Sequence, residues 1–296
     1  MQVGSEKSWR FIDTAISNGF LNMAIDEAML EAHLYGFTPP TLRVYRWDPP
    51  ALSLGYFQNL ERVVELKRCS VLGIEIVRRL TGGRAVLHQN ELTYSVVTSE
   101  KHGVPKSITQ SYQFLSKALI AAYGILGLEV CLAPRTGRLL SAACFTSATL
   151  ADLTFQGRKL AGSAQFRKGD ALLQHGSLPI GLDAQLFFSI LKFHSTSIRD
   201  KTLAAFTQKA TAISEILGNR IDWQELKGAL FEGFQKALGV ELYQDVLTPG
   251  EIDRSQKLAK EKYSTFAWNY YGRYDDGVRG ETTEITSLVG EIVSPS

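Results

Sequence analysis

Long apolar runs are absent from this chain of 296 residues, and no stretch approaches the roughly 18 consecutive apolar residues that a membrane-spanning helix needs. The first fifteen residues, MQVGSEKSWRFIDTA, also lack the apolar run and the small-residue cleavage site of a secretory signal. We therefore expect a soluble protein of the cytoplasm that makes no contact with a membrane.

The chain also has few cysteines and little net charge. The three cysteines, Cys69, Cys131 and Cys144, are too few and too irregularly spaced for a disulfide framework or a zinc site, so we expect reduced thiols and no bound metal. The 32 Lys and Arg residues nearly balance the 30 Asp and Glu residues, which leaves a net charge of +2. Because no basic stripe is interleaved with aromatic residues, we expect no nucleic-acid partner.

The chain does contain 45% hydrophobic residues, enough for a full-sized core, and they follow alternating helix and strand patterns. Residues 21–35 carry an apolar helical stripe with Asn18 or Asn22 as its cap, and residues 108–126 form a helical pattern that ends at Gly127. Strand patterns occupy residues 41–47, 51–57, 74–79, 92–98 and 128–133. Three further strand patterns, separated by turn residues, predict an antiparallel meander over 148–155, 158–166 and 171–180.

Helical patterns dominate the rest of the chain, over residues 184–193, 208–218, 222–238 and 249–262. The expected fold is therefore α/β of the α+β kind, built on a mixed sheet. We expect a catalytic domain over residues 1–200, a helical C-terminal part over 201–275 packed on it, and a mobile tail over 276–296.

The segment RRLTGGRAVLHQNELTYSVV, residues 78–97, places a glycine turn before a strand pattern. The backbone N–H groups of Gly82 and Gly83 can approach a ligand closely. The turn is surrounded by three arginines, Arg78, Arg79 and Arg84, and together these groups predict an anion site. The alternative explanation is a tight hairpin turn with arginines at a solvated strand end.

A second segment, GRKLAGSAQFRKGDALLQHGSL at residues 157–178, repeats the theme. Lys159 is followed by small residues, so its amine can reach across a pocket floor, or else it is an outward-facing charge of a hairpin. His88 in the first segment and His175 in the second are candidates for proton transfer, with a structural hydrogen-bonding role as the alternative. Two such segments in one chain predict one pocket with two walls.

The cysteines differ in their surroundings. Cys144 lies in the small-residue segment SAACFTSAT, which favours an accessible loop, and a loop cysteine near a lysine is a candidate thiolate nucleophile. Cys69 and Cys131 sit beside apolar residues and are expected to be packing residues.

Both segments resemble signatures of one family. RRLTGGRAVLHQ resembles the Arg-Arg-x-Thr/Ser-Gly-Gly-x-Ala-Val-x-His signature of lipoate-protein ligases and octanoyltransferases, and GRKLAGSAQ with LLQHGS resembles the second signature of that family. WRFIDTAISNGFLNMAIDEAML, TLRVYRWDPPALSLGYFQN and TFAWNY extend the resemblance along most of the chain. ACFTSATLADLTFQGRKLAGSAQ is most similar to the cysteine-dependent octanoyltransferases.

The resemblance implies a catalytic domain of the biotin/lipoate protein ligase type. It implies transfer of an octanoyl group from acyl carrier protein to one lysine of a lipoyl-domain protein, such as the glycine-cleavage H protein or a 2-oxoacid dehydrogenase subunit, as the first step of endogenous lipoylation. It carries the nucleophile onto Cys144 and the family lysine onto Lys159, with no cofactor. Nothing in the sequence requires more than a monomer. The remaining positions of the two signatures are expected to bind substrate: Arg78, Thr81, Gly82, Gly83, His88, Gly162, Ser163, Ala164 and His175.

The sequence departs from the family pattern at three places. Arg84 replaces the third glycine of the ligases, Gln89 stands where aspartate is usual, and residues 146–148 read Thr-Ser-Ala in place of Asp-Ala-Pro. Three alternatives stay open: an ATP-dependent lipoate or octanoate ligase in which Lys159 holds an acyl-adenylate, an amidotransferase between lipoyl-domain proteins, and a member that only binds lipoyl domains.

Overall fold

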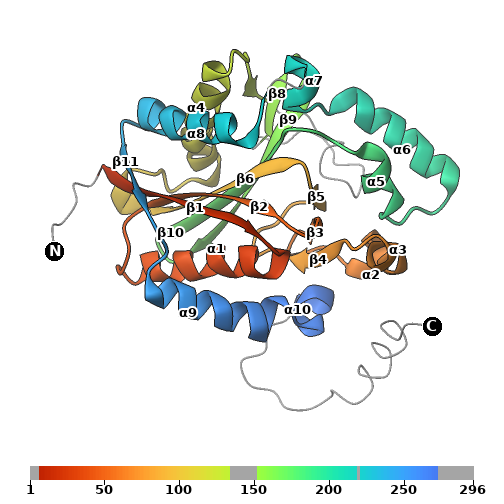
Figure 1. The fold of residues 1–296 in the computed structure, drawn as a ribbon, viewed down its shortest axis with the longest axis horizontal. Helices are drawn as coiled ribbons and strands as arrows, with labels where there is room; N and C mark the ends of the chain where they lie inside the picture. The colour runs from red at the N-terminus through yellow and green to blue at the C-terminus, as the bar shows by residue number, and fades with distance from the viewer. Residues whose placement is uncertain (1–6, 134–151, 219–220, 273–296) are drawn as a thin grey trace.

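The computed structural model describes residues 7–133, 152–218 and 221–272, and it is built around a mixed sheet of eight strands in the order β11-β1-β2-β6-β10-β9-β8-β7 (Figure 1). β1 is parallel to both β2 and β11, and the pairs from β2 through β7 are antiparallel. The strands are β1 (Ser8–Ser17), β2 (Thr41–Trp47), β6 (Glu91–Ser99), β7 (Cys131–Leu132), β8 (Asp152–Phe155), β9 (Arg158–Lys168), β10 (Ala171–Pro179) and β11 (Glu241–Asp245).

A smaller sheet of three strands, in the order β4-β3-β5, holds the first glycine-rich segment. Its strands are β3 (Ala51–Leu54), β4 (Glu75–Arg78) and β5 (Val86–His88). β4 and β5 both pair with β3, in parallel and antiparallel respectively. The loop over residues 79–85 is therefore anchored at both of its ends.

Helices cover both faces of the main sheet (Figure 1). α1 (Gly19–Leu34) and α9 (Pro249–Leu258) pack together on one face, and α4 (Ile108–Ile125) and α8 (Trp223–Leu238) pack together on the other. Consecutive residues of β6 show the alternation, since Val96 joins the core under α4 and α8 whereas Val97 joins the core under α1.

The remaining helices lie at the edges of these layers. They are α2 (Leu60–Val63), α3 (Leu66–Val71), α5 (Ala184–Ser189), α6 (Thr196–Lys209), α7 (Ile213–Leu217) and α10 (Phe266–Tyr271), with the short helical turns η1 (Glu100–His102) and η3 (Ala259–Tyr263). Phe187, Phe188 and Phe206 pack α5 and α6 onto the apolar side of the small sheet. Among the described residues, no helix is long and apolar enough to cross a membrane.

Local signals account for the ends of several elements. Asn18 caps α1 by accepting from the backbone N–H of Leu21 at 2.9 Å, which confirms one of the two expected caps, whereas Asn22 is buried inside the helix. Gln156 and Gly157 both adopt positive φ angles, 49° and 78°, as a two-residue hairpin turn between β8 and β9 requires. The expected antiparallel meander is confirmed as β8-β9-β10.

Other elements differ from the sequence-based expectation. The strand β11 was not predicted, and neither was most of α6, whose buried apolar contact is made by Phe206. The helix expected over residues 208–218 is interrupted, because the Thr211 N–H donates to the Lys159 carbonyl at 2.9 Å and Ala210 bridges to the same residue of β9. Sheet pairing thus replaces helical hydrogen bonds at this point.

The expectation that Cys131 is a packing residue is wrong, because the side chain is exposed. Cys131 belongs to β7, which has two residues and, among the described strands, forms the edge of the sheet with β8 as its one partner. Cys69 is buried as expected, and burial raises the pKa of its thiol to about 11.

The contact between α4 and α8 gives a stability prediction. A Cβ atom on Gly233 would lie 2.7 Å from the Ala118 carbonyl oxygen and 2.6 Å from the Ala122 nitrogen, so the two helix backbones would have to separate. We expect Gly233→Ala to lower the free energy of unfolding by about 1–3 kcal/mol in chemical denaturation. Gly228→Ala on the exposed side of α8, where nothing lies within 4 Å, is the matched control and should raise it by about 0.5–1 kcal/mol. Equal effects of the two substitutions would contradict the close helix approach.

Candidate active site

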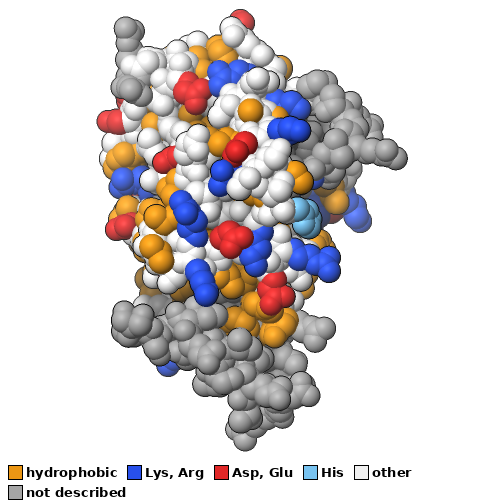
Figure 2. Space-filling view, turned by 90° about the vertical axis from the view of Figure 1, so that its right-hand side faces the viewer, with side chains coloured by type: hydrophobic (Ala, Val, Ile, Leu, Met, Phe, Trp, Pro, Cys, Tyr) orange, Lys and Arg blue, Asp and Glu red, His pale blue; other side chains and the backbone are white. Residues whose placement is uncertain are grey.

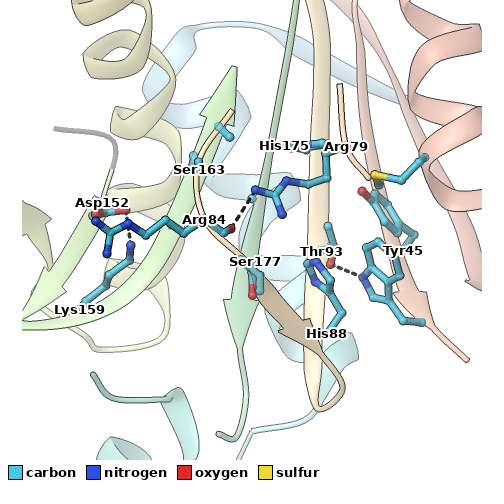
Figure 3. Close-up of a pocket in the computed structure, with 17 residues that line it drawn as sticks. Tyr45, Arg79, Arg84, His88, Thr93, Asp152, Lys159, Ser163, His175 and Ser177 are labelled. Carbon is cyan, nitrogen blue, oxygen red and sulfur yellow. Dashed lines mark hydrogen bonds and ion pairs between the residues drawn. The ribbon is translucent and has the colours of Figure 1, made fainter. Parts of the chain in front are cut away.

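A cavity of about 350 Å³ lies between the main sheet and the loop that joins β4 to β5 (Figure 3). The first glycine-rich segment lines one wall and the second lines the other, so the structure brings the two together as one pocket. They meet because β10 pairs with β6 on one side and with β9 on the other. Figure 3 shows Lys159 and Asp152 at one side of the pocket and His88 and Tyr45 at the other.

Lys159 faces this cavity from β9 and is only 2% exposed to solvent. Its Nζ atom lies 2.8 Å from Oδ1 of Asp152, which is buried on the adjacent strand β8. Leaving one partner of such a buried pair without the other costs about 3–5 kcal/mol, so the carboxylate stabilises the lysine where it stands. The alternative of an outward-facing hairpin charge is therefore excluded.

The surroundings of this ion pair fix its position. The pairing of β8 with β9 changes register between Leu153 and Thr154, one residue beyond Asp152. A Cβ on Gly162 would lie 3.2 Å from both the lysine Nζ and the Asp152 Oδ1, so the absence of a side chain there leaves the pair its space. Sequence reasoning missed Asp152, although an acidic residue in an apolar strand one hairpin before the signature lysine was an available signal.

His175 joins the second wall to α1 and to the glycine turn. Its Nδ1 donates to Oδ2 of Asp26 at 3.0 Å, and its Nε2 accepts from the Thr81 hydroxyl at 2.7 Å. Burial lowers the pKa of His175 below the ordinary 6.5 by more than Asp26 raises it, so the ring is neutral at pH 7. Thr81 is fully buried and acts through this histidine rather than by lining the cavity.

Asp26 on α1 is the buried acceptor of this network. Arg43 of β2 donates to it at 2.7 Å, and the Tyr45 hydroxyl donates at 3.0 Å. Burial alone would raise the pKa of Asp26, but Arg43 and His175 together outweigh burial and hold that pKa below its ordinary value. The carboxylate therefore stays charged and fixes the aromatic wall that Tyr45 supplies.

His88 and Trp47 form a stacked aromatic pair in the wall opposite Lys159, with ring centroids 4.0 Å apart and planes 12° from parallel. The Nδ1 atom of His88 lies 2.7 Å from Glu91 Oε1, and its Nε2 lies 2.6 Å from the Ser53 hydroxyl. The Trp47 indole N–H donates to Thr93 at 2.7 Å. Both rings are thus held in place by hydrogen bonds to neighbouring side chains.

The three arginines of the first segment have different positions. Arg79 and Arg84 line the cavity, but Arg78 is 1% exposed and is not part of the wall. The Arg78 guanidinium donates instead to main-chain carbonyls from two distant segments, those of Gly55, Tyr56, Gln58, Trp268, Asn269 and Tyr270. The structure therefore replaces the substrate contact expected of Arg78 with a structural role, which ties α10 to the chain after β3.

The glycine turn itself is packed against the end of β3. Gly83 adopts a φ of 96° and lines the cavity, whereas Gly82 points its carbonyl at the guanidinium of Arg79, which donates to it at 3.1 Å. A Cβ on Gly55 would lie 2.0 Å from the Gly83 carbonyl oxygen, so the two backbones can approach this closely only with glycine at position 55. Of the expected turn residues, Gly83 is the one that faces the cavity.

The remaining expected residues fall in two groups. Gly162, Ser163 and Ala164 line the cavity on β9, and the Ser163 hydroxyl lies 2.7 Å from the Tyr94 hydroxyl. Cys144, the expected nucleophile, lies outside the described residues.

Gln89 is exposed and does not line the cavity. Within the described ranges, no group of three or more His, Cys, Asp or Glu side chains is placed to hold a metal ion.

Comparison with known proteins shows the family to which this chain belongs. Residues 18–235 match the sequence profile of the lipoyl protein ligase A/B catalytic domain, which covers well over half of the chain. The chain belongs to this family. The resemblance drawn from the two glycine-rich segments is thereby confirmed, and both segments lie inside the matched range.

Curated relatives match almost end to end. The chain is 42% identical over 271 residues to the octanoyltransferase LipM of Anoxybacillus flavithermus, which covers 88% of this chain and 98% of that protein. It is 38% identical over 274 residues to the octanoyltransferase LipM of Bacillus subtilis, with 90% and 99% covered.

Solved structures of lipoate-protein ligases share the fold. A bipartite lipoate protein ligase from Thermoplasma acidophilum superposes with a TM-score of 0.78 at 27% identity, covering 92% of this chain and 99% of that one. A lipoate-protein ligase A bound with ATP gives a TM-score of 0.74 at 27% identity, covering 89% and 98%. The expected mixed α/β fold of the family is confirmed.

The buried charge of Asp26 gives a stability prediction. Asp26→Asn leaves the Arg43 guanidinium buried without its counter-charge, so we expect the free energy of unfolding to fall by about 3–5 kcal/mol in urea denaturation. Glu261→Gln, which removes an exposed pair with Lys257, should cost less than about 1 kcal/mol. Comparable losses in both variants would show that Asp26 is not the central acceptor.

The neutral His175 gives a pH prediction. Its pKa is lower in the folded than in the unfolded protein, so the unfolded state binds more protons and stability falls as the pH drops below about 6.5. We expect His175→Gln to flatten this dependence between pH 6.5 and 5 by up to about 1.4 kcal/mol per pH unit. Denaturation series across this range measure the slope, with exposed His194→Gln as the control. An unaltered slope for His175→Gln would refute the neutral buried ring.

Proposed function

We propose that this chain is an octanoyltransferase that moves an octanoyl group from octanoyl-acyl carrier protein to one lysine of a lipoyl-domain protein. The observation that carries the proposal is the buried pair of Lys159 and Asp152 at one side of a largely apolar cavity, in a chain whose near full-length relatives are named octanoyltransferases. Both walls of the cavity come from one chain, so a monomer suffices for the reaction.

The size and lining of the cavity suit a medium-length acyl chain. An apolar cavity of about 150 Å³ holds benzene, so a cavity of about 350 Å³ has room for eight carbons and a carbonyl group. Met23, Tyr45, Trp47 and Val86 offer the apolar contacts. The acyl tail lies against the aromatic wall, which leaves its carbonyl beside Lys159.

The first half-reaction forms an acyl-enzyme on Cys144. The Cys144 thiolate attacks the octanoyl thioester, a new carbon–sulfur bond forms, and the carrier thiolate leaves and takes up a proton. Exchange of one thioester for another needs little free energy, so no ATP is consumed. The Lys159 ammonium lowers the energy of the cysteine thiolate, and the Asp152 carboxylate keeps that ammonium aimed into the cavity.

The second half-reaction passes the octanoyl group to the acceptor. The neutral amine of the acceptor lysine attacks the Cys144 thioester, the amide carbon–nitrogen bond forms as the carbon–sulfur bond breaks, the cysteine leaves as a thiolate, and the amine passes one proton to solvent. The Gly83 peptide is the part of the glycine turn that faces the cavity, so its N–H is the donor that we assign to the developing oxyanion. His88, His175 and residues 162–164 shape the wall around the acyl group.

An ATP-dependent ligase is the second candidate, because a structural relative of the same fold is described with bound ATP. In that reaction Lys159 would hold an acyl-adenylate, and Cys144 would take no part. A transferase between two lipoyl-domain proteins would use the same acyl-enzyme with a different donor.

Acylation of Cys144 is the first prediction of this mechanism. Incubation with octanoyl-acyl carrier protein without ATP should add the mass of one octanoyl group to the intact protein, as measured by mass spectrometry. Cys144→Ser should abolish the adduct because the nucleophile is lost, and Cys131→Ser, which removes the exposed cysteine of β7, should retain it. If no adduct forms and the acceptor is labelled only with ATP and free octanoate, the chain is a ligase.

The ion pair gives a kinetic prediction. Lys159→Ala should slow both half-reactions by roughly 10²–10³-fold, because the Cys144 thiolate that attacks in the first and leaves in the second loses its neighbouring cation. Asp152→Asn should slow them less, since the lysine remains but is no longer held. Quenched-flow measurement of acyl-enzyme formation separates the two half-reactions. A normal acylation rate in Lys159→Ala would remove the lysine from thiolate activation.

A further inference from the structure

The floor of the cavity is a single row of residues that lie directly opposite one another on neighbouring strands. The row runs from β8 through β9, β10 and β6 to β2. Its members are Asp152, Gly162, Ser177, Thr93 and Tyr45, and all five line the cavity. Directly opposed residues project from the same face of a sheet, so the row forms one continuous floor.

The three inner members of the row are small. Gly162 has no side chain, and the hydroxyls of Ser177 and Thr93 both donate to the buried carboxylate of Glu91. Because these hydroxyls are engaged by that carboxylate, the middle of the floor is shallow and suits an apolar chain.

Larger groups close the two ends of the row. A Cβ on Gly162 would lie 3.2 Å from the Lys159 Nζ atom, so the ammonium group lies over the β9 position. At the β2 position stands the ring of Tyr45, which is 1% exposed. Figure 3 shows Lys159 and Tyr45 at opposite sides of the pocket. The row is therefore a trough with a cation at one end and an aromatic ring at the other.

The length of this trough fits an acyl chain of eight carbons. Three strand spacings separate the β9 position from the β2 position, and at about 4.8 Å each they span about 14 Å. The seven carbon–carbon bonds of an extended octanoyl chain span about 8 Å, at the roughly 1.2 Å per bond of an extended backbone. The remaining distance of about 6 Å is close to one carbon–carbon contact plus one hydrogen bond.

Tyr45 is held firmly at its end of the trough. Its hydroxyl donates to Asp26 at 3.0 Å, and the Arg43 guanidinium carbon lies 3.8 Å from the ring centroid. Met23 of α1 also lines the cavity, packs in the same apolar cluster as Tyr45 and is 2% exposed. A longer chain therefore meets an end wall that is supported from behind.

The outer surface is a poor place to measure an acyl chain. On the face of the molecule shown in Figure 2, hydrophobic side chains are scattered among basic and acidic ones. Single exposed apolar residues are normal on a protein surface and enclose nothing. Chain length is selected where the chain is enclosed, which is the trough.

We propose that Tyr45 sets the length of the acyl group, as the end wall of a trough that holds straight chains of up to about eight carbons. This inference rests on the proposed function, because it assigns the specificity of the same site. Extra methylenes would push the ring off its contacts with Asp26 and Arg43. Each methylene that a shorter chain lacks lowers the affinity about fourfold, because less apolar surface is buried.

Binding of straight-chain carboxylates tests this length limit without depending on the reaction. Isothermal titration calorimetry gives Kd for hexanoate, octanoate, decanoate and dodecanoate, whose carboxylate takes the place of the acyl carbonyl beside Lys159. In the unsubstituted chain we expect octanoate to bind most tightly and decanoate to bind about tenfold or more weakly. Tyr45→Ala should move the tightest binding to ten or twelve carbons, whereas Tyr45→Phe, which keeps the ring, should leave it at eight.

Met23→Ala enlarges the same end of the trough and leaves the bond between Tyr45 and Asp26 in place. It should raise the affinity for decanoate relative to octanoate by about tenfold. Tyr35→Ala is the matched control, since Tyr35 is 66% exposed at the end of α1 and does not line the cavity. Tightest binding that stays at eight carbons in both Tyr45→Ala and Met23→Ala overturns the proposal, and so does an equal weakening of all four acids.

Failure of the proposed function is seen in a separate measurement. Acyl-pantetheine thioesters of the same four chain lengths are incubated with the protein, and acyl-enzyme formation is followed by intact mass spectrometry. If the chain is not a transferase, none of the four forms an acyl-enzyme, while the binding series still decides the role of Tyr45. Acylation rates that follow the length profile of the binding series support both.

Discussion

The carboxylate of Asp26 is the contact on which the arrangement of the site depends. It accepts from Arg43 and Tyr45 on β2 and from His175 on β10, so it fixes α1 against two strands of the main sheet. Through His175 the same network reaches the Thr81 hydroxyl and holds the glycine turn. One buried negative charge on the first helix thereby sets the relative position of both cavity walls.

Burying charged side chains costs free energy, so the positions at which the protein does so are informative. Replacing a buried ion pair by apolar residues of similar size is often neutral or stabilising, so stability alone does not account for two such pairs beside one cavity. The pair of Arg43 and Asp26 supports the wall from behind, whereas Lys159 and Asp152 line the cavity surface itself. The second pair is therefore the one whose charge is presented to the cavity, and it is where we place the chemistry.

The last described elements of the chain hold the glycine-rich turn of the site in position. β11 extends the main sheet beside β1, and α10 is tied to the glycine-rich segment because Arg78 donates to its carbonyls while the Trp268 indole donates to the Arg78 carbonyl. Residues nearly 200 positions apart thus hold the first turn of the site in place. The C-terminal elements contribute to one framework with the catalytic segments, and α8 belongs to the same core as β1 and β6.

The sequence by itself determined the local features. The Asn18 cap, the turn at Gln156 and Gly157, the meander and the pairing of two signature segments in one pocket all rest on residues within a few positions of one another or on the family resemblance. Backbone preferences and capping act over such short distances, so they can be recognised in one sequence.

Only the tertiary structure decided which side chains meet. Arg78 and Arg79 are adjacent in sequence, yet one donates to distant carbonyls and the other lines the cavity, because side chains of successive residues at the end of β4 point to opposite sides. The partner of Lys159 was settled by the register of β8, and the exposure of Cys131 by its place at the sheet edge. Contacts between strands distant along the chain depend on the whole core being assembled, and no short pattern of residues encodes them.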